Sequence, residues 1–150
     1  MNHRDLILDA MRRMGKSIAK ELQEDAKDMT GTQLYAQEDY VPSFALARAK
    51  VNMLERPSGF LCRSSAGRIV KLLQPYDSDI YPQEPEELTA QWGFVWSTDP
   101  KKARPFVSVA TSPYMAGDCC TEGGKCYRSK IDNNVWGPLA YRQGWEEVYG

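Results

Sequence analysis

The sequence changes character near residue 56, and this change limits the folds that are open to the chain. Residues 1–56 contain no tryptophan and one of the nine prolines, whereas residues 57–150 contain all four tryptophans and eight prolines. Apolar periodicity with little proline favours helices, while proline, glycine and aromatic residues together favour short strands joined by turns. We therefore predict an α+β fold, with N-terminal helices over residues 1–56 and a small antiparallel β domain over residues 57–150.

The N-terminal part carries a regular apolar stripe, which predicts one amphipathic helix over residues 5–29. Its members, spaced by three or four residues, are Ile7, Met11, Met14, Ile18, Leu22, Ala26 and Met29. The stripe can pack on the rest of the chain or on a partner helix, or it can form a self-associating bundle. A capping-box pattern at Thr30 and Gln33 predicts a second short helix over residues 32–39, and apolar spacing predicts a third over 44–54. We expect this region to serve docking or oligomerisation, and the protein to be a homo-oligomer.

Strand patterns dominate after residue 59. Two apolar runs, at residues 59–63 and 68–73, flank a Ser-Ser-Ala-Gly segment and predict a β-hairpin. The proline-rich acidic segment 74–87 predicts a long loop. Further predicted strands cover residues 91–96, 105–110, 125–130 and 145–148.

The overall charge excludes some classes of partner. Nineteen Lys and Arg residues balance twenty Asp and Glu residues, which gives a net charge of -1. Such a chain has no field that attracts nucleic acid or an anionic membrane. Its apolar runs are too short for a membrane-spanning helix, and its first residues do not resemble a signal peptide. We expect a soluble protein that is made in the cytoplasm, without nucleic-acid binding or membrane insertion.

Catalytic and metal-binding patterns are weak in this sequence. The four cysteines, Cys62, Cys119, Cys120 and Cys126, match no standard zinc spacing, so reduced thiols are favoured over a structural zinc or a disulfide. His3 is the single histidine and stands near the N-terminus, which disfavours Cys–His or Ser–His catalysis. The carboxylates of residues 77–87 favour a solvated loop over a calcium site or an acid–base pair. We therefore expect no metal, no cofactor and no enzymatic activity.

Aromatic residues give the strongest functional indication. Six of them fall in the last 40 residues, and they are interleaved with amides and carboxylates. Sugar rings stack their C–H groups on aromatic faces while polar neighbours bind the hydroxyls, so this composition is typical of a carbohydrate-binding surface. A small β domain also needs large aromatics for its core, and each single residue favours that role. The candidate binding residues are Tyr127, Trp136, Tyr141, Trp145, Asn133 and Asn134.

The order of residues in this part of the chain resembles a known family. The landmarks are Tyr114-Met-Ala-Gly117-Asp118, Gly124-Lys-Cys-Tyr127, Trp136-Gly-Pro138 and Gly144-Trp145. They resemble the small chitin-binding-type modules of chitinases, of which divergent copies end bacteriophage tail and fibre proteins. The likeness covers residues 105–148. Two departures are the lack of a tryptophan in residues 106–113, just before Tyr114, and the absence of a proline-led run between Trp136 and Trp145.

The resemblance implies a bacteriophage virion protein of the tail or capsid surface, assembled in the host cytoplasm. Its helices would contact other virion proteins, and its C-terminal module would bind a host cell-surface glycan. The main alternative is a purely structural phage protein that uses the module for protein docking and binds no glycan. A cell-wall enzyme is a third possibility, for which the sequence offers no catalytic constellation.

Overall fold

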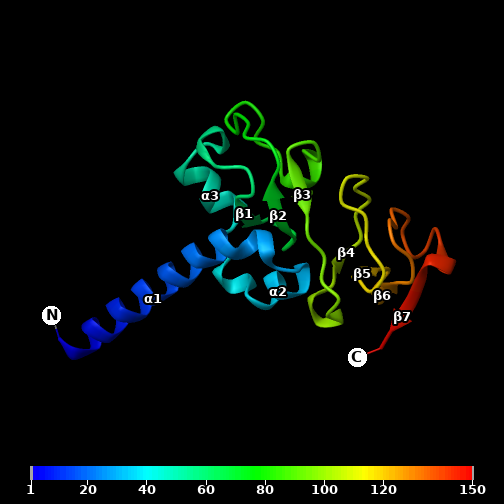
Figure 1. Cartoon of the computed structure of the whole chain (residues 1–150), viewed down its shortest axis with the longest axis horizontal. Helices are drawn as coiled ribbons and strands as arrows, with labels where there is room; N and C mark the ends of the chain where they lie inside the picture. The colour runs from blue at the N-terminus through cyan, green and yellow to red at the C-terminus, as the bar shows by residue number, and fades with distance from the viewer. Residues whose placement is uncertain (1, 150) are drawn as a thin grey trace.

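The computed structural model describes residues 2–149 and places helices first and strands after them (Figure 1). The helices are α1 (His3–Asp25), α2 (Gly31–Ala36) and α3 (Phe44–Lys50). Short 3₁₀ helices connect the larger elements: η1 (Ala26–Asp28), η2 (Glu38–Tyr40), η3 (Met53–Glu55), η4 (Pro85–Glu87), η5 (Pro100–Lys102) and η6 (Arg142–Gly144). The predicted α+β class is confirmed.

The strands form two sheets. The first has the order β1-β2-β3, from β1 (Leu61–Arg63), β2 (Ile69–Leu72) and β3 (Trp92–Phe94), all antiparallel. The second has the order β4-β5-β6-β7, from β4 (Arg104–Pro105), β5 (Cys119–Glu122), β6 (Lys125–Ser129) and β7 (Trp145–Val148). Its ladders are antiparallel except for β4, which pairs with β5 in parallel.

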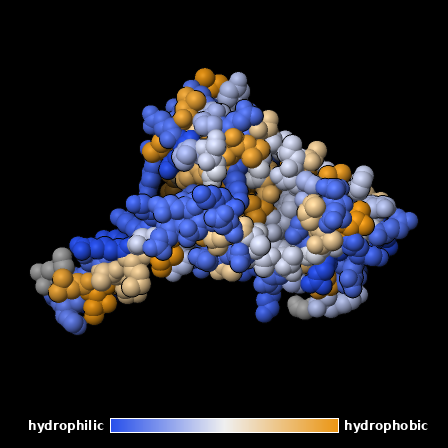
Figure 2. Space-filling view, viewed as in Figure 1, coloured by the Kyte–Doolittle hydropathy of each residue, from blue (hydrophilic) through white to orange (hydrophobic). Residues whose placement is uncertain are grey.

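The two halves of helix α1 differ in how much of their surface is buried. The side chain of Asn2 caps its N-terminus by accepting the Asp5 N–H at 2.9 Å. Towards its C-terminal end, Leu22 is buried, and Ala26 of η1 is buried directly after it. The first half instead projects away from the body of the molecule (Figure 1), and its free end has an apolar surface (Figure 2). The predicted helix is confirmed, but the body covers only one end of its apolar stripe.

The capping box and the hairpin predicted from the sequence are both present. Thr30 accepts the N–H of Gln33 at 3.2 Å, while the Gln33 amide oxygen accepts the N–H of Thr30 at 2.9 Å. In the hairpin, Cys62 lies opposite Val70. Gly67 between the strands has a φ of +84°, which glycine adopts without steric cost.

Two apolar clusters form the core, and both contain residues from either side of residue 56. The larger one packs Phe44 of α3 edge-on against Trp92 of β3, with ring centroids 5.8 Å apart. It continues to Trp96, which stacks on Tyr114 at 4.1 Å. The smaller cluster contains Leu22 from α1 and Leu34 and Tyr35 from α2, together with Leu61 and Ile69 of the first sheet. The helices α2 and α3 therefore share their core with the strands.

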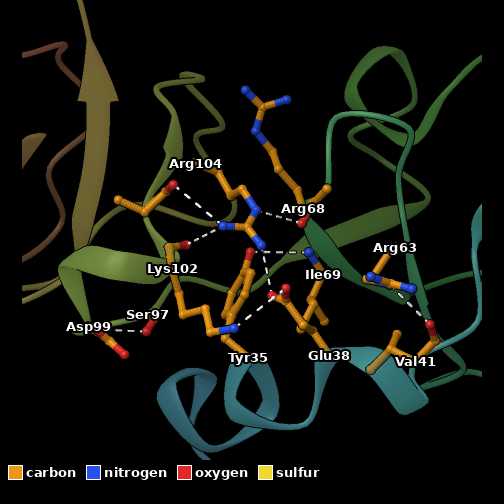
Figure 3. Close-up of polar contacts among 12 residues, drawn as sticks. Tyr35, Glu38, Val41, Arg63, Arg68, Ile69, Ser97, Asp99, Lys102 and Arg104 are labelled. Carbon is orange, nitrogen blue, oxygen red and sulfur yellow. Dashed lines mark hydrogen bonds and ion pairs between the residues drawn. The ribbon is translucent and has the colours of Figure 1, made fainter. Parts of the chain in front are cut away.

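A cluster of polar contacts, here called the polar joint, connects α2 and η2 to η5 and to β4 of the second sheet (Figure 3). The Arg104 guanidinium donates to Glu38 Oε2 at 2.7 Å, to the Gly67 carbonyl at 3.0 Å and to the Lys102 carbonyl at 2.9 Å. It also lies over the Tyr35 ring, 5.4 Å from the centroid. One side chain thereby contacts the hairpin turn, η2, η5 and α2.

The second sheet corrects two strand predictions. Of the strand expected at residues 105–110, only Pro105 belongs to β4, and the last backbone hydrogen bond to β5 is donated by the Phe106 N–H to the Thr121 carbonyl at 2.8 Å. Strand β5 was not predicted, although it lies between β4 and β6. It starts at adjacent cysteines, and alternation in so short a run is hard to recognise.

Candidate functional site

Trp136 is the most exposed of the four tryptophans, with 52% of its surface accessible. Its backbone is nevertheless fixed on both sides. The Trp136 N–H donates to Asn134 Oδ1 at 3.3 Å, and its carbonyl accepts the indole N–H of Trp145 at 2.8 Å. The Tyr141 ring packs against the indole at 66°, with centroids 5.5 Å apart. The protein therefore holds an exposed indole face in a defined position.

Asn134 and Trp145 are buried, so two of the six candidate side chains expose little surface, although Trp145 still contributes to the lining of a hollow on the second sheet. Asn134 is fully buried, and its amide donates to Ser129 Oγ at 3.0 Å and to the Gly144 carbonyl at 3.2 Å. Trp145 packs edge-on against Tyr114, 5.3 Å between centroids, because alternation along β7 turns it inwards. Both residues shape the surface from below by holding the Trp136 backbone.

Tyr127 lies beside a hollow of about 340 Å³ on the second sheet. The register places Tyr127 opposite Glu147 and Lys125 two residues before it, so these side chains share one face with Trp145. Lys125 and Glu147 form an ion pair at 3.6 Å. The remaining lining residues are Gly123, Pro138, Leu139 and Arg142. The hollow thus joins an aromatic ring to groups of both charges.

The turn over residues 136–141 connects the two features. The Tyr141 N–H donates to the Gly137 carbonyl at 2.8 Å, and Leu139 N–H donates to Glu122 Oε1 at 2.9 Å. Trp136 begins this turn, and Leu139 forms part of the wall of the hollow. The structure therefore brings Trp136 and Tyr141 together, with Tyr127 on the adjoining face.

Asn133 is exposed, and it has a φ of +55°. Asparagine tolerates this left-handed conformation better than most residues, so a conformational role explains its presence. The sequence argument missed Lys125 and Arg142. The two-residue spacing of Lys125 and Tyr127 along a strand could have identified the first of them.

The landmarks of the resemblance are positions that the local fold requires. Gly117, Gly123 and Gly124 all have positive φ angles, and Gly123 and Gly124 form the turn between β5 and β6. Asp118 accepts the Met115 N–H at 2.8 Å, and burial raises the pKa of its carboxyl. Tyr114 is buried in the core. These residues therefore have a structural role in a turn-rich β unit.

Three of the four cysteines lie on β5 and β6, beside this surface, and all four carry protons at neutral pH. Burial raises the pKa of Cys119 to about 11, and it also raises the pKa values of Cys62, Cys120 and Cys126. All four are free thiols. His3 begins α1, at the end that projects from the body (Figure 1).

Hydrogen bonds from Asn52, which precedes η3, hold the acidic loop of residues 74–87 in place. Asn52 donates from its amide to Asp77 at 2.9 Å and to Asp79 at 3.2 Å, and this bonding lowers the pKa of Asp77. Within residues 2–149, no group of three or more histidines, cysteines or carboxylates is arranged to hold a metal ion. Over the same residues, no helix combines the length and apolar character that crossing a membrane requires.

The fold and this surface define an α+β protein with an exposed tryptophan, packed against a half-buried tyrosine, in the connection between β6 and β7. Comparison with known protein families, curated proteins and solved structures finds no match to the chain.

Proposed function

We propose that this chain is a non-enzymatic bacteriophage virion protein, whose C-terminal aromatic surface binds carbohydrate on the host cell. The observation that carries the proposal is the exposed Trp136 ring on a fixed backbone, with Tyr141 packed against it. The phage context comes from the landmark order in residues 105–148. The helical region would contact other virion proteins.

A fixed indole suits carbohydrate because its ring binds without losing much conformational freedom. A pyranose presents C–H groups that pack on the aromatic face, and Tyr141, at 66° to Trp136, forms a second wall. Sugar hydroxyls also need polar partners. Lys125, Glu147 and Arg142 line the adjoining hollow, so a chain of two or more sugar units would contact both features.

Retention on insoluble chitin, peptidoglycan and host cell walls tests the proposal. Trp136→Ala should weaken retention about tenfold, because stacking and apolar burial at one ring are both lost. The fold should survive, since the backbone groups of residue 136 that bind Asn134 and Trp145 remain. Tyr81→Ala is the matched control, because Tyr81 is equally exposed but lies in the loop after β2.

The outcome that contradicts glycan binding is equally clear. If the wild type is not retained on any of these polymers, and oligosaccharides leave its tryptophan fluorescence unchanged, the carbohydrate proposal fails.

One observation favours protein docking as a second candidate. Leu139 and Met115 are exposed in the same C-terminal unit as Trp136, and exposed apolar side chains also suit a protein partner. In that case Trp136→Ala would disturb particle assembly and would leave any polymer retention unchanged.

A further inference from the structure

The N-terminal half of α1 exposes large apolar side chains along one face. Met11 and Met14 are 64% and 65% exposed, and Ile7 is 48% exposed. Ile18, at the end of this face nearest the body, is half-buried. A helix that projects with a continuous apolar face into water is unusual, because burial of that face against a partner lowers the free energy.

Helical geometry places these four side chains in a narrow stripe. At 3.6 residues per turn, Ile7, Met11, Met14 and Ile18 fall within about 60° of one another around the axis. Arg4 precedes Ile7 by three residues and Glu21 follows Ile18 by three residues, so each continues the stripe at one end. Both charged side chains are exposed. The stripe therefore has an apolar centre, a cation at its N-terminal end and an anion at its C-terminal end.

This charge order distinguishes the two ways in which the helix can pair with a second copy. Side by side in parallel, each layer meets its own copy, so Arg4 faces Arg4 and Glu21 faces Glu21. In the antiparallel arrangement that superimposes the stripes, Ile7 meets Ile18 and Met11 meets Met14. The same register brings Arg4 against Glu21 at both ends. Opposite charges at the ends of an apolar seam specify its direction and register.

We propose that α1 forms an antiparallel pair with α1 of a second copy of this chain, with four apolar layers closed at each end by an Arg4–Glu21 ion pair. The pairing extends the assembly role of the proposed function, but it rests on α1 alone and does not require carbohydrate binding. The seam from Arg4 to Glu21 spans about 26 Å at 1.5 Å per residue.

The flanks of the seam allow the helices to approach closely. The positions beside the apolar layers are Leu8, Ala10, Gly15 and Ser17, which are small or uncharged. A Cβ on Gly15 would meet nothing within 4 Å, although Gly15 lines a hollow between α1 and residues 39–42. Antiparallel helices also align their dipoles favourably, whereas parallel helices do not. Over fewer than three heptads, the drift of a straight helix from the seam stays small.

Sedimentation equilibrium of the full chain over a wide concentration range tests the proposal. The wild type should be a dimer that dissociates on dilution. Met11→Glu should weaken the dimer about a hundredfold, because each helix then carries a carboxylate into the apolar centre. Leu6→Glu is the matched control: Leu6 is 54% exposed but lies outside the seam, about 110° around the helix axis from the centre of the stripe, so the same charge change should leave the dimer intact. Folding is monitored by circular dichroism.

Charge reversal then tests the direction. Arg4→Glu and Glu21→Arg should each weaken the dimer about tenfold, because like charges meet at both ends, and the double variant R4E/E21R should restore it. A parallel pair would show no such rescue. The proposal is overturned by a monomer at all concentrations, by a trimer, by a dimer that Met11→Glu leaves unchanged, or by failure of the double variant to recover.

The two proposals fail separately. Loss of polymer retention in the wild type with an intact dimer would reject carbohydrate binding alone. A monomeric wild type that still binds oligosaccharide would reject the α1 pair alone.

Discussion

Tyr35 links α2 to the first sheet through one hydroxyl group. Its hydroxyl donates to the Val95 carbonyl at 2.8 Å and accepts the Ile69 N–H at 3.1 Å. The side chain is almost fully buried, and burial raises the pKa of Tyr35 to about 12, against 10.0 for an ordinary tyrosine. The folded protein therefore keeps this phenol neutral at a pH where the unfolded chain would lose the proton.

Tyr35→Phe should change both stability and its dependence on pH. Near neutral pH, the variant should lose about 1–3 kcal/mol of unfolding free energy, because Ile69 N–H and Val95 C=O lose their partner. Between pH 10 and about 12 the unfolded chain binds fewer protons than the folded one, so wild-type stability falls as pH rises. The gap between wild type and variant should therefore shrink over this range. Urea unfolding at a series of pH values measures it.

The control for this titration is Tyr81→Phe, which alters an exposed side chain. Its stability should follow that of the wild type throughout. If the difference in unfolding free energy between the wild type and Tyr35→Phe stays constant from pH 8 to 12, the ionisation of Tyr35 does not contribute to the loss of stability at alkaline pH as predicted.

At the binding surface, the residue types could be predicted from the sequence, but their exposure could not. The pattern placed Trp136 and Tyr141 among the candidate binding residues, and the structure packs these two rings together. The pattern could not show that Trp136 is exposed and Trp145 is buried, because the face of β7 that points inwards depends on the pairing of β7 with β6. Asn134 is polar, yet it is buried because its amide satisfies groups of two other loops. Whether these side chains are exposed or buried depends on contacts with residues that are distant in the sequence.

At the scale of elements, the ion pairs of Glu38 connect η2 to η5 and β4 (Figure 3). Glu38 lies 2.7 Å from Arg104 and 3.6 Å from Lys102, and its side chain is 17% exposed. Partly buried, charge-assisted hydrogen bonds contribute more to stability than exposed ion pairs do. The polar joint should therefore contribute more to the unfolding free energy than any single ion pair on α1.

Glu38→Gln should lower the unfolding free energy by about 1–2 kcal/mol, because Arg104 keeps its carbonyl partners but loses its counter-ion. Asp9→Asn is the control, since Asp9 pairs with Arg13 at 2.8 Å on the exposed part of α1 and should cost at most about 0.5 kcal/mol. Chemical unfolding in low salt measures both. Equal losses for the two variants would show that the joint adds no stability beyond a surface ion pair.

Local signals predicted the elements that depend on local interactions. The capping box at Thr30 and the hairpin of β1 and β2 follow from neighbouring residues, and both are present. The short β4 depends on a partner that is distant in sequence, and β5, although it pairs with the neighbouring β6, is too short and too weakly alternating for the pattern to separate it from irregular chain. The apolar stripe of α1 predicted the helix. It could not show that the first half projects from the rest of the molecule, because the exposure of these side chains depends on how far the other elements extend along the helix.

For the whole molecule, the helix pair and the aromatic surface have a joint consequence that rests on both proposals. A dimer presents two copies of the Trp136 surface, one on each body, and the bodies lie towards opposite ends of the helix pair. On a polymer with many sugar units, the second contact becomes intramolecular once the first has formed. Weak sites on each chain would then together give strong retention on the polymer. A net charge of -1 per chain adds no electrostatic attraction to this retention.

Met11→Glu should therefore separate the two kinds of binding. Its affinity for a soluble oligosaccharide, measured per chain by tryptophan fluorescence, should equal that of the wild type, because Trp136 lies between β6 and β7 and not on α1. Its retention on insoluble polymer should fall at least about tenfold, since a monomer cannot make the second contact. Leu6→Glu should match the wild type in both assays. If Met11→Glu is monomeric and yet retained like the wild type, each chain binds the polymer independently, and the pair of helices serves assembly without contributing to attachment.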